Sequence, residues 1–201
     1  MAPIVLGAHE RGTIHFMTPR AISVRIAEPR DAQAIAMMSR DFIEAGLGWK
    51  YDAARVMRAI RDRETLAVVA CEGGKASTTA AGNRGALTGF AIMEFGDERA
   101  HLVLLAVRPS HRRLGIGQRL LEWLLESARC AGMASIHLEL RSNNDAARRF
   151  YRAMNFYETV LVPGYYRSGE GRKEGALRML RVLRTPGPVP YTWRPPRTED
   201  T

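Results

Sequence analysis

The chain has 201 residues, of which 46% are hydrophobic, and it carries a formal net charge of +9 at pH 7. This size suffices for one hydrophobic core with extensions and leaves little room for a second domain. No stretch approaches the ~20 consecutive apolar residues that cross a bilayer, and the first twenty residues lack the apolar centre of a signal peptide. The charge favours anionic partners without choosing among a polyphosphate cofactor, RNA and an acidic protein surface.

The cysteines and histidines give no indication of a metal site. Cys71 lies in an apolar run, and Cys130 lies late in a predicted helix. Neither has a metal-binding spacing, and His101 and His137 have no Cys, Asp or Glu at ligand spacing. We therefore expect no metal, and we expect both cysteines to be reduced, as in a cytoplasmic protein. The lack of a long apolar stretch leads us to expect no membrane span.

In the first part of the chain, period-two patterns predict strands and helical spacing predicts helices. Residues 1–20 carry no period and are interpreted as an N-terminal extension. The elements predicted up to residue 71 are a strand over 22–27, a helix over 31–45, a short helix over 52–61 and a buried strand over 66–71. Small and polar residues over 72–85 then predict a flexible hairpin connection.

The second part alternates strands with helices. The predicted elements are strands over 86–95 and 100–107, a helix after the basic turn that follows, a strand over 135–141, a helix over 144–154, and strands over 156–162 and 176–183. Five prolines after Thr185 are too many for a packed element. We therefore expect one domain over residues 21–184 and a disordered Pro-rich tail over 185–201.

The most informative segment runs from Val107 to Gln118, where an apolar strand leads through a basic turn into an amphipathic helix. Gly115 and Gly117 let a ligand approach the backbone, and the first amides of a helix lack intrahelical partners and attract an anion. Leu120 stands where a dinucleotide fingerprint needs its third glycine, and no nucleoside triphosphate loop is present. The segment predicts a phosphate cradle of another type, with a plain helix-entry turn as the alternative.

The predicted helix over 144–154 carries three residues that share one face. Asn144, Ala147 and Tyr151 are separated by three and four positions. The Asn side chain can hydrogen-bond an amide-bearing ligand, Ala leaves the face open, and Tyr supplies a proton donor. The alternative is that Asn144 only starts the helix and Tyr151 only packs in the core.

From His101 to Tyr166 the chain resembles the ribosomal-protein-alanine N-acetyltransferases of the GNAT family. The matching segments are residues 101–107, the turn Arg-x-x-Gly-x-Gly, residues 138–141, the spaced set Asn144, Ala147 and Tyr151, and the pair Tyr165-Tyr166. A weaker likeness extends over residues 22–183. The resemblance implies an α/β fold with a mixed, mostly antiparallel sheet, flanked by helices and splayed between two central strands.

The resemblance also implies acetyl-CoA as the cosubstrate and assigns its contacts. The backbone edge of one central strand would bind the pantetheine arm through Leu105, Ala106 and Val107. The residues that would hold the pyrophosphate are Arg112, Arg113, Leu114, Gly115, Ile116, Gly117 and Gln118. Asn144 and Ala147 would border the arm.

Two residues receive catalytic roles from the resemblance. Glu139 would be the general base, acting through water, and Tyr151 would protonate the departing thiolate. Period two turns Glu139 to the sheet face opposite its neighbours Leu138 and Leu140. An ion pair with Arg141 or with a nearby helix is the alternative for Glu139. Tyr165 and Tyr166 would bind a substrate peptide, unless they are only surface aromatics of a hairpin.

The expected reaction is direct acetyl transfer to a primary amine, first of all the α-amine of a protein N-terminus such as that of a ribosomal protein. Leu104 replaces a commonly polar residue of the family, and the segment Gly46 to Trp49 lacks the Pro-Trp-Ser-like pattern of its closest members. A small-molecule amine is therefore kept as an alternative acceptor. A non-catalytic acyl-CoA-binding or RNA-contacting module is the other alternative. Nucleic acid is not expected as a substrate, and homo-oligomerisation is left open.

Overall fold

The computed structural model describes residues 22–73, 85–167 and 173–184. The expected extension over 1–20, nearly all of the connection over 72–85 and the Pro-rich tail over 185–201 lie outside the described residues. None of the described helices is long and apolar enough to cross a membrane.

Seven strands form one sheet in the order β1-β2-β3-β4-β5-β7-β6. The elements are β1 (Ile22–Ile26), η1 (Pro29–Asp31), α1 (Ala32–Phe42), α2 (Ala53–Arg61), β2 (Thr65–Glu72), β3 (Ala86–Phe95), β4 (Arg99–Val107), η2 (Pro109–His111), α3 (Ile116–Cys130), β5 (Ser135–Arg141), α4 (Asp145–Ala153), β6 (Tyr157–Arg167) and β7 (Lys173–Val182). Only β4 and β5 pair in parallel; every other neighbouring pair is antiparallel. The expected mixed, mostly antiparallel sheet is confirmed.

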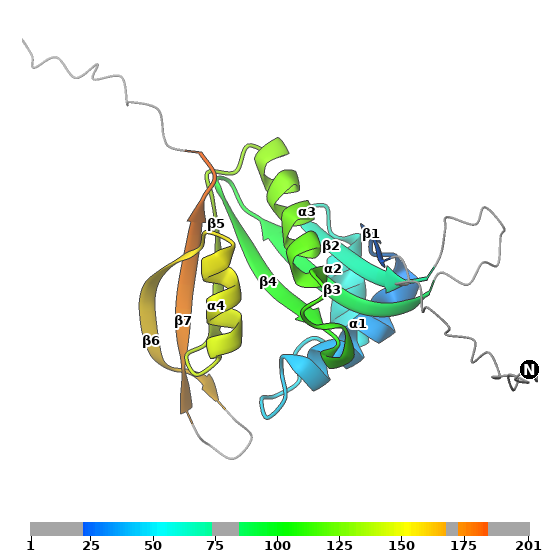
Figure 1. Cartoon of the computed structure of the whole chain (residues 1–201), viewed down its shortest axis with the longest axis horizontal. Helices are drawn as coiled ribbons and strands as arrows, with labels where there is room; N and C mark the ends of the chain where they lie inside the picture. Colours follow the sequence, from blue (N-terminus) through cyan, green and yellow to red (C-terminus); the bar gives the residue numbers. More distant parts are fainter. Residues whose placement is uncertain (1–21, 74–84, 168–172, 185–201) are drawn as a thin grey trace, which may run out of the picture.

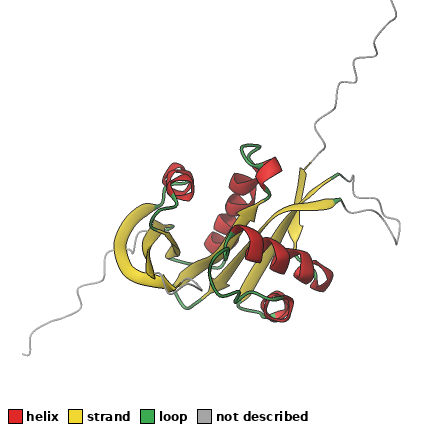
Figure 2. Ribbon diagram, turned by 90° about the horizontal axis from the view of Figure 1, so that it is seen from below, coloured by secondary structure: helices red, strands yellow, loops and turns green. Residues whose placement is uncertain are grey.

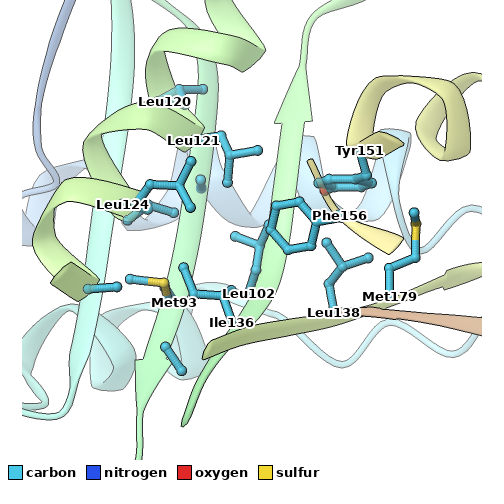
Figure 3. Close-up of a cluster of buried hydrophobic side chains, with 14 of the residues drawn as sticks. Met93, Leu102, Leu120, Leu121, Leu124, Ile136, Leu138, Tyr151, Phe156 and Met179 are labelled. Carbon is cyan, nitrogen blue, oxygen red and sulfur yellow. The ribbon is translucent and has the colours of Figure 1, made fainter. Parts of the chain in front are cut away.

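Helices cover both faces of the sheet (Figures 1 and 2). Helices α3 and α4 pack on one face, here called the α3–α4 face, over a core that includes Leu120, Leu124, Leu138 and Met179 (Figure 3). Helices α1 and α2 pack on the opposite α1–α2 face. Alternation along β5 sends Ile136, Leu138 and Leu140 into the first core, as the sequence pattern predicts, and the odd-numbered residues to the other face.

A β-bulge changes which face the residues of β4 occupy. Ile92 on β3 pairs with Leu104, whereas Met93 pairs with Leu102, so Val103 is an extra residue on β4. Because one extra residue reverses the alternation, Leu102 belongs to the α3–α4 core, and Leu104 belongs to the α1–α2 core. Leu105 and Val107 pack against the α3–α4 core.

Strands β4 and β5 separate after a short paired segment. They pair only at Arg99–Ser135, Ala100–Ile136 and His101–His137. Beyond His101, β4 is registered with β3 alone, and β5 instead pairs with β7 along its whole length. Figure 1 shows the two strands diverging from this point. The splay between central strands that the sequence leads us to expect is confirmed, and it exposes one backbone edge of β4 over residues 102–107.

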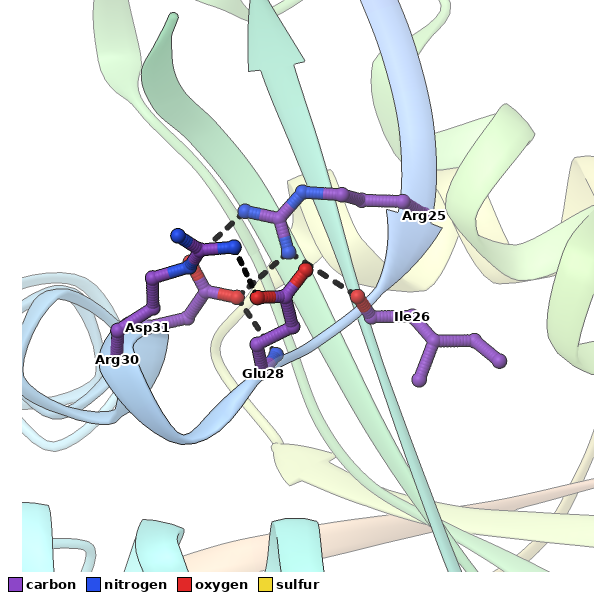
Figure 4. A network of polar contacts seen from close by, with 5 residues as sticks. All are labelled: Arg25, Ile26, Glu28, Arg30 and Asp31. Carbon is purple, nitrogen blue, oxygen red and sulfur yellow. Dashed lines mark hydrogen bonds and ion pairs between the residues drawn. The ribbon is translucent and has the colours of Figure 1, made fainter. Parts of the chain in front are cut away.

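A charged cluster fixes the connection between β1 and α1 (Figure 4). Arg25 donates two hydrogen bonds to the Asp31 carboxylate, at 2.6 and 2.9 Å, and the Glu28 backbone N–H donates a third at 2.7 Å. Arg30 pairs with the Glu28 carboxylate. The buried Asp31 therefore joins the end of an edge strand to the helix that follows and sets the direction of α1.

Most predicted boundaries are correct within one or two residues, but three are wrong: the end of α1, the end of β6 and the start of β7, which lies at Lys173 instead of residue 176. Helix α1 ends at Phe42 instead of residue 45, because the Ile43 and Glu44 backbone N–H groups both donate to the Ser39 carbonyl and close the helix. Strand β6 continues to Arg167 instead of ending at residue 162. After a register irregularity it pairs again with an equally extended β7, so Tyr165 and Tyr166 lie within a strand.

Candidate active site

The loop over residues 108–115 contains two residues in the left-handed region. Arg113 has φ +67° and Gly115 has φ +74°. A non-glycine residue with positive φ is uncommon and costs energy, so this backbone conformation at Arg113 marks the turn as one that the sequence pays to form. Gly115 needs to be glycine for its backbone conformation alone, because an added Cβ would meet nothing within 4 Å.

The first turn of α3 is open to an anion. Gly115 is the N-cap residue, and no side chain caps the helix. The first intrahelical donor that bonds back is Arg119 N–H, to the Gly115 carbonyl at 3.0 Å. The N–H groups of Ile116, Gly117 and Gln118 therefore have no partner within the part of the chain that the structure describes. Such amides, at the positive end of the helix dipole, suit a phosphate.

Arginines around this turn divide into two groups. Arg108 and Arg112 hold the loop itself, because their Nε atoms donate to the Leu87 carbonyl at 2.6 Å and the Val107 carbonyl at 3.2 Å. Arg113 makes no hydrogen bond or ion pair with any described residue. It is thus the cation of this loop that a bound anion can engage without breaking a contact of the fold.

Gly117 lies where the start of α3 meets α4. An added Cβ would stand 3.5 Å from Cζ of Phe150 and 3.7 Å from Cγ2 of Val107, which is ordinary van der Waals contact. The fold alone would accept a methyl group there. A larger side chain would enter the space between the end of β4 and α4.

Asn144 is the N-cap of α4. Its Oδ1 accepts a hydrogen bond from the Ala147 backbone N–H at 3.1 Å. Asn144 therefore does cap the start of the helix, as the alternative interpretation expected. Because its Oδ1 is used in the cap, only its side-chain NH2 group is left to bind a ligand. Ala147 packs at the margin of the α3–α4 core, one turn before Tyr151.

Tyr151 is buried in the α3–α4 core, with 8% of its surface exposed. Its ring makes edge contacts with Phe150, with centroids 5.1 Å apart, and with Phe156, with centroids 5.6 Å apart. Figure 3 shows Tyr151 beside Phe156 in this core. Burial raises the pKa of its hydroxyl far above the usual range, and the neighbouring Tyr166 adds to that rise. The Tyr151 hydroxyl therefore keeps its proton at physiological pH and can act as a donor but not as a base.

Glu139 faces the other side of the sheet and is held by two partners. One carboxylate oxygen lies 2.8 Å from Nε2 of His101, and the other accepts a hydrogen bond from Nε of Arg178 at 2.8 Å. The hydrogen bond with His101, followed by that from Arg178, lowers the pKa of Glu139 to about 2, against the opposing effect of burial. The alternative of an ion pair holds, but the partner differs from the expected ones: Glu139 pairs with Arg178, its neighbour in the register of β5 and β7, whereas Arg141 pairs with Glu174.

Two histidines join Glu139 at the point where β4 and β5 part. The rings of His101 and His137 stack 4.5 Å apart and 5° from parallel. Together with Glu139 they offer three potential ligand atoms within 4.8 Å of one another, a grouping that the spacing along the sequence does not indicate. Imidazoles that share a metal direct in-plane lone pairs to one point, and parallel rings do not.

The loop between α1 and α2 owes its shape to Glu44, which the sequence analysis missed. Its buried carboxylate accepts hydrogen bonds from Ser39 Oγ at 2.9 Å and from the backbone N–H groups of Lys50 and Tyr51 at 2.7 and 3.2 Å. An acidic residue at a helix end is the only signal in the sequence, and it is a weak one. The loop reaches β5, because Arg141 donates to the Ala45 carbonyl at 2.5 Å.

Tyr165 and Tyr166 sit near the end of β6. Their rings meet at 80° with centroids 5.0 Å apart, and Tyr165 is half exposed. Burial and Tyr165 together raise the pKa of Tyr166 to about 12. Tyr166 raises the pKa of Tyr151, and Glu139 raises the pKa of Tyr166. Tyr166 is therefore close enough to both candidate catalytic residues to interact electrostatically with each, although the two stand on opposite faces of the sheet.

Comparison with known proteins places this geometry in a family. Residues 35–156 match the model of the acetyltransferase (GNAT) family. The chain is 33% identical over 98 residues to the [Ribosomal protein bS18]-alanine N-acetyltransferase of Escherichia coli, a match that spans 49% of this chain and 66% of that protein, just under two thirds. It is 37% identical over 109 residues to an uncharacterized N-acetyltransferase of Methanocaldococcus jannaschii, spanning 54% of this chain and 68% of that protein.

Solved structures show the same fold. The structure of the Escherichia coli ribosomal-protein-S18-alanine N-acetyltransferase has a TM-score of 0.66 at 24% identity, with 85% of this chain and 99% of that chain covered. The structure of Arabidopsis thaliana NAA60 in complex with acetyl-CoA has a TM-score of 0.70 at 16% identity, with 81% and 99% covered. At these identities the likeness concerns the fold.

Proposed function

The chain belongs to the acetyltransferase (GNAT) family, and from that premise we propose that it transfers the acetyl group of acetyl-CoA directly to a primary amine, the α-amine of a protein N-terminus. We assign this activity to a domain over residues 21–184 that works in the cytoplasm. The observation that carries the proposal is the placement of Glu139 and Tyr151 on opposite faces of the sheet, beside the splay between β4 and β5.

On the α3–α4 face, acetyl-CoA would bind along the splay. The open amides of Ile116, Gly117 and Gln118 and the unengaged Arg113 suit its pyrophosphate. The unpaired edge of β4 at Leu105, Ala106 and Val107 offers backbone groups to the amide-bearing pantetheine arm. The Asn144 NH2 group can donate to the same arm, with Leu114 and Ala147 at the margin.

The amine would approach from the α1–α2 face. Attack of the neutral amine nitrogen on the thioester carbonyl forms a C–N bond, and collapse of the intermediate breaks the C–S bond. The amine proton must leave toward the Glu139 side, and the thiolate gains a proton from the buried, fully protonated Tyr151. Direct transfer needs both substrates bound at once, which two separate faces allow.

The acceptor assignment rests on similarity and on the surroundings of Glu139. The Escherichia coli relative is named for the alanine of a ribosomal protein, so a protein N-terminus such as that of a ribosomal protein is the first acceptor to test. Tyr165, Tyr166 and the loop held by Glu44 border the approach and offer aromatic surface to a peptide. An α-amine, with a pKa of about 8, is also easier to deprotonate than a lysine side chain.

The test is release of CoA thiol from acetyl-CoA over a panel of amines. The panel contains peptides with free N-termini, matched peptides with blocked N-termini and an internal lysine, and polyamines, aminoglycosides and amino acids. Release confined to free N-termini supports the proposal. Thiol release only with a small-molecule amine would contradict the protein acceptor and assign the enzyme to acetylation of a small-molecule amine. Acetyl-CoA binding without release on any acceptor, or RNA binding with steep salt dependence, contradicts it.

A further inference from the structure

The cluster around Glu139 contains more ionisable groups than one general base requires. His101 and His137 form the last registered pair before β4 and β5 separate, and Glu139 is the next residue on β5 that faces the same side. His101 keeps a third of its side chain exposed, whereas that of Glu139 is only 8% exposed.

Glu139 is poorly suited to take up the proton itself. Both of its carboxylate oxygens are engaged, one with His101 and one with Arg178, each at 2.8 Å. Protonating the carboxylate would disrupt both contacts, and its pKa of about 2 reflects that cost. A base works best when its pKa lies near the operating pH, and this carboxylate does not meet that condition.

We propose that His101 accepts the proton of the acceptor amine, and that Glu139 is a positioning residue that holds the His101 ring with its proton on Nε2. This assignment rests on the proposed acetyl transfer. With Nε2–H donating to Glu139, the Nδ1 lone pair of His101 is left to accept a proton, and Nδ1 has no partner among the described residues. Glu139 then stabilises the imidazolium that forms, without being protonated.

The proton balance is complete without any further reactant. The amine proton moves to Nδ1 of His101, directly or through one water, as the C–N bond forms. The C–S bond breaks, and the thiolate takes its proton from Tyr151. His101 then releases its proton to solvent and Tyr151 regains one from solvent, so one amide and one thiol result and the enzyme returns to its starting state.

The groups that face His101 come from three neighbouring strands. Glu94 on β3 is its registered neighbour, His137 and Glu139 lie on β5, and Arg178 on β7 completes the cluster. Burial and then His101 lower the pKa of the stacked His137, which disfavours a charge on that ring. His137 therefore contributes a neutral ring stacked on His101.

The experiment replaces the histidines one at a time and follows steady-state acetylation. His101→Gln keeps a donor for Glu139 but has no titrating nitrogen, and we expect kcat to fall about 100-fold, with the Kd of acetyl-CoA unchanged and the acidic limb of the pH–rate profile lost. His137→Gln is the matched control, with a loss of kcat at least tenfold smaller. In His101→Ala, added imidazoles should restore the rate in order of their pKa.

A wild-type kcat and pH profile in His101→Gln would overturn the proposal and leave Glu139 as the base. A second measurement needs no acceptor: ¹⁵N NMR of the protein without substrates should find the His101 proton on Nε2, and a proton on Nδ1 overturns the proposal directly. If the wild-type protein acetylates no amine in the panel, the proposed function fails, and the role of His101 fails with it. If the wild type acetylates an amine and His101→Gln is equally active, only the role of His101 fails and the proposed function stands.

Discussion

The two faces of the sheet differ in how their functional groups are organised. On the α3–α4 face, the loop over 108–115 and the first turn of α3 leave amides and the Arg113 side chain without partners among the described residues, and Tyr151 lies among apolar side chains. On the α1–α2 face, the carboxylates are already engaged, Glu44 with three donors and Glu139 with two. One face leaves donors available for a large anionic ligand, and the other holds a hydrogen-bonded polar network that the amine of a protein N-terminus can approach.

This difference separates binding from chemistry. Substitutions on the α3–α4 face should act mainly on the affinity for acetyl-CoA and on departure of the thiolate. Substitutions in the Glu139 network should act on proton removal and leave that affinity intact. Four predictions test whether the faces are as independent as their contacts suggest.

The largest effect is expected from Glu139→Gln. The amide cannot stabilise a cation on His101 and leaves Arg178 without its carboxylate, so kcat should fall by about 100-fold, no more than for His101→Gln. The Kd of acetyl-CoA, measured by calorimetry, should not change. A loss of cofactor affinity comparable to the loss of kcat would show that the two faces are coupled.

Tyr151→Phe is the corresponding change on the α3–α4 face. A thiolate leaves more readily than most groups, so loss of the acid should lower kcat by about tenfold, less than for Glu139→Gln. The unfolding free energy should change little, because no described group hydrogen-bonds the Tyr151 hydroxyl. If the rate of acetyl transfer in single-turnover assays is unchanged, water and not Tyr151 protonates the thiolate.

Gly117→Ala separates ligand binding from folding. Ala fits the fold and is favoured over Gly within a helix by about 0.5–1 kcal/mol, so the melting temperature should hold or rise. We expect the Kd of acetyl-CoA to rise by about tenfold, since one tenfold step corresponds to ~1.4 kcal/mol of lost contact.

The control at this turn is Gly115→Ala, whose positive φ should cost about 1–2 kcal/mol of stability. Thermal unfolding and calorimetry on both variants distinguish the two glycines. An unchanged Kd in Gly117→Ala would remove this residue from the cradle.

The smallest effect concerns acid stability of the Glu139 network. The pKa of Glu139 is lowered to about 2 in the folded protein, so the ionised carboxylate stabilises the fold above the pKa of the unfolded chain, about 4.3. This contribution, on the order of 1–2 kcal/mol after solvent screening, should be lost as the pH falls from about 4.3 to about 2. Urea unfolding over this range should show a flatter pH dependence for Glu139→Gln than for the wild type.

The sequence predicted most of the fold, because its signals are local. The apolar spacing of α3 and the alternation of β5 predicted their extents closely. The wrong boundaries lie at positions where contacts that the local pattern does not encode determine where an element ends. Helix α1 ends where the Ile43 and Glu44 N–H groups both donate to the Ser39 carbonyl, and the Glu44 carboxylate then holds the following loop. The length of β6 depends on renewed pairing with β7.

The sequence by itself determined the parts of the candidate site that adjacent residues build: the glycine turn before α3, and the face shared by Asn144, Ala147 and Tyr151. Spacing along one helix or turn fixes these directions. Only the tertiary structure decided which groups surround Glu139. Arg178 is its partner through the register of β5 and β7, and His101 and His137 meet because β4 and β5 pair for three residues before they part. Register and splay arise from the packing of the whole sheet, which no local spacing encodes.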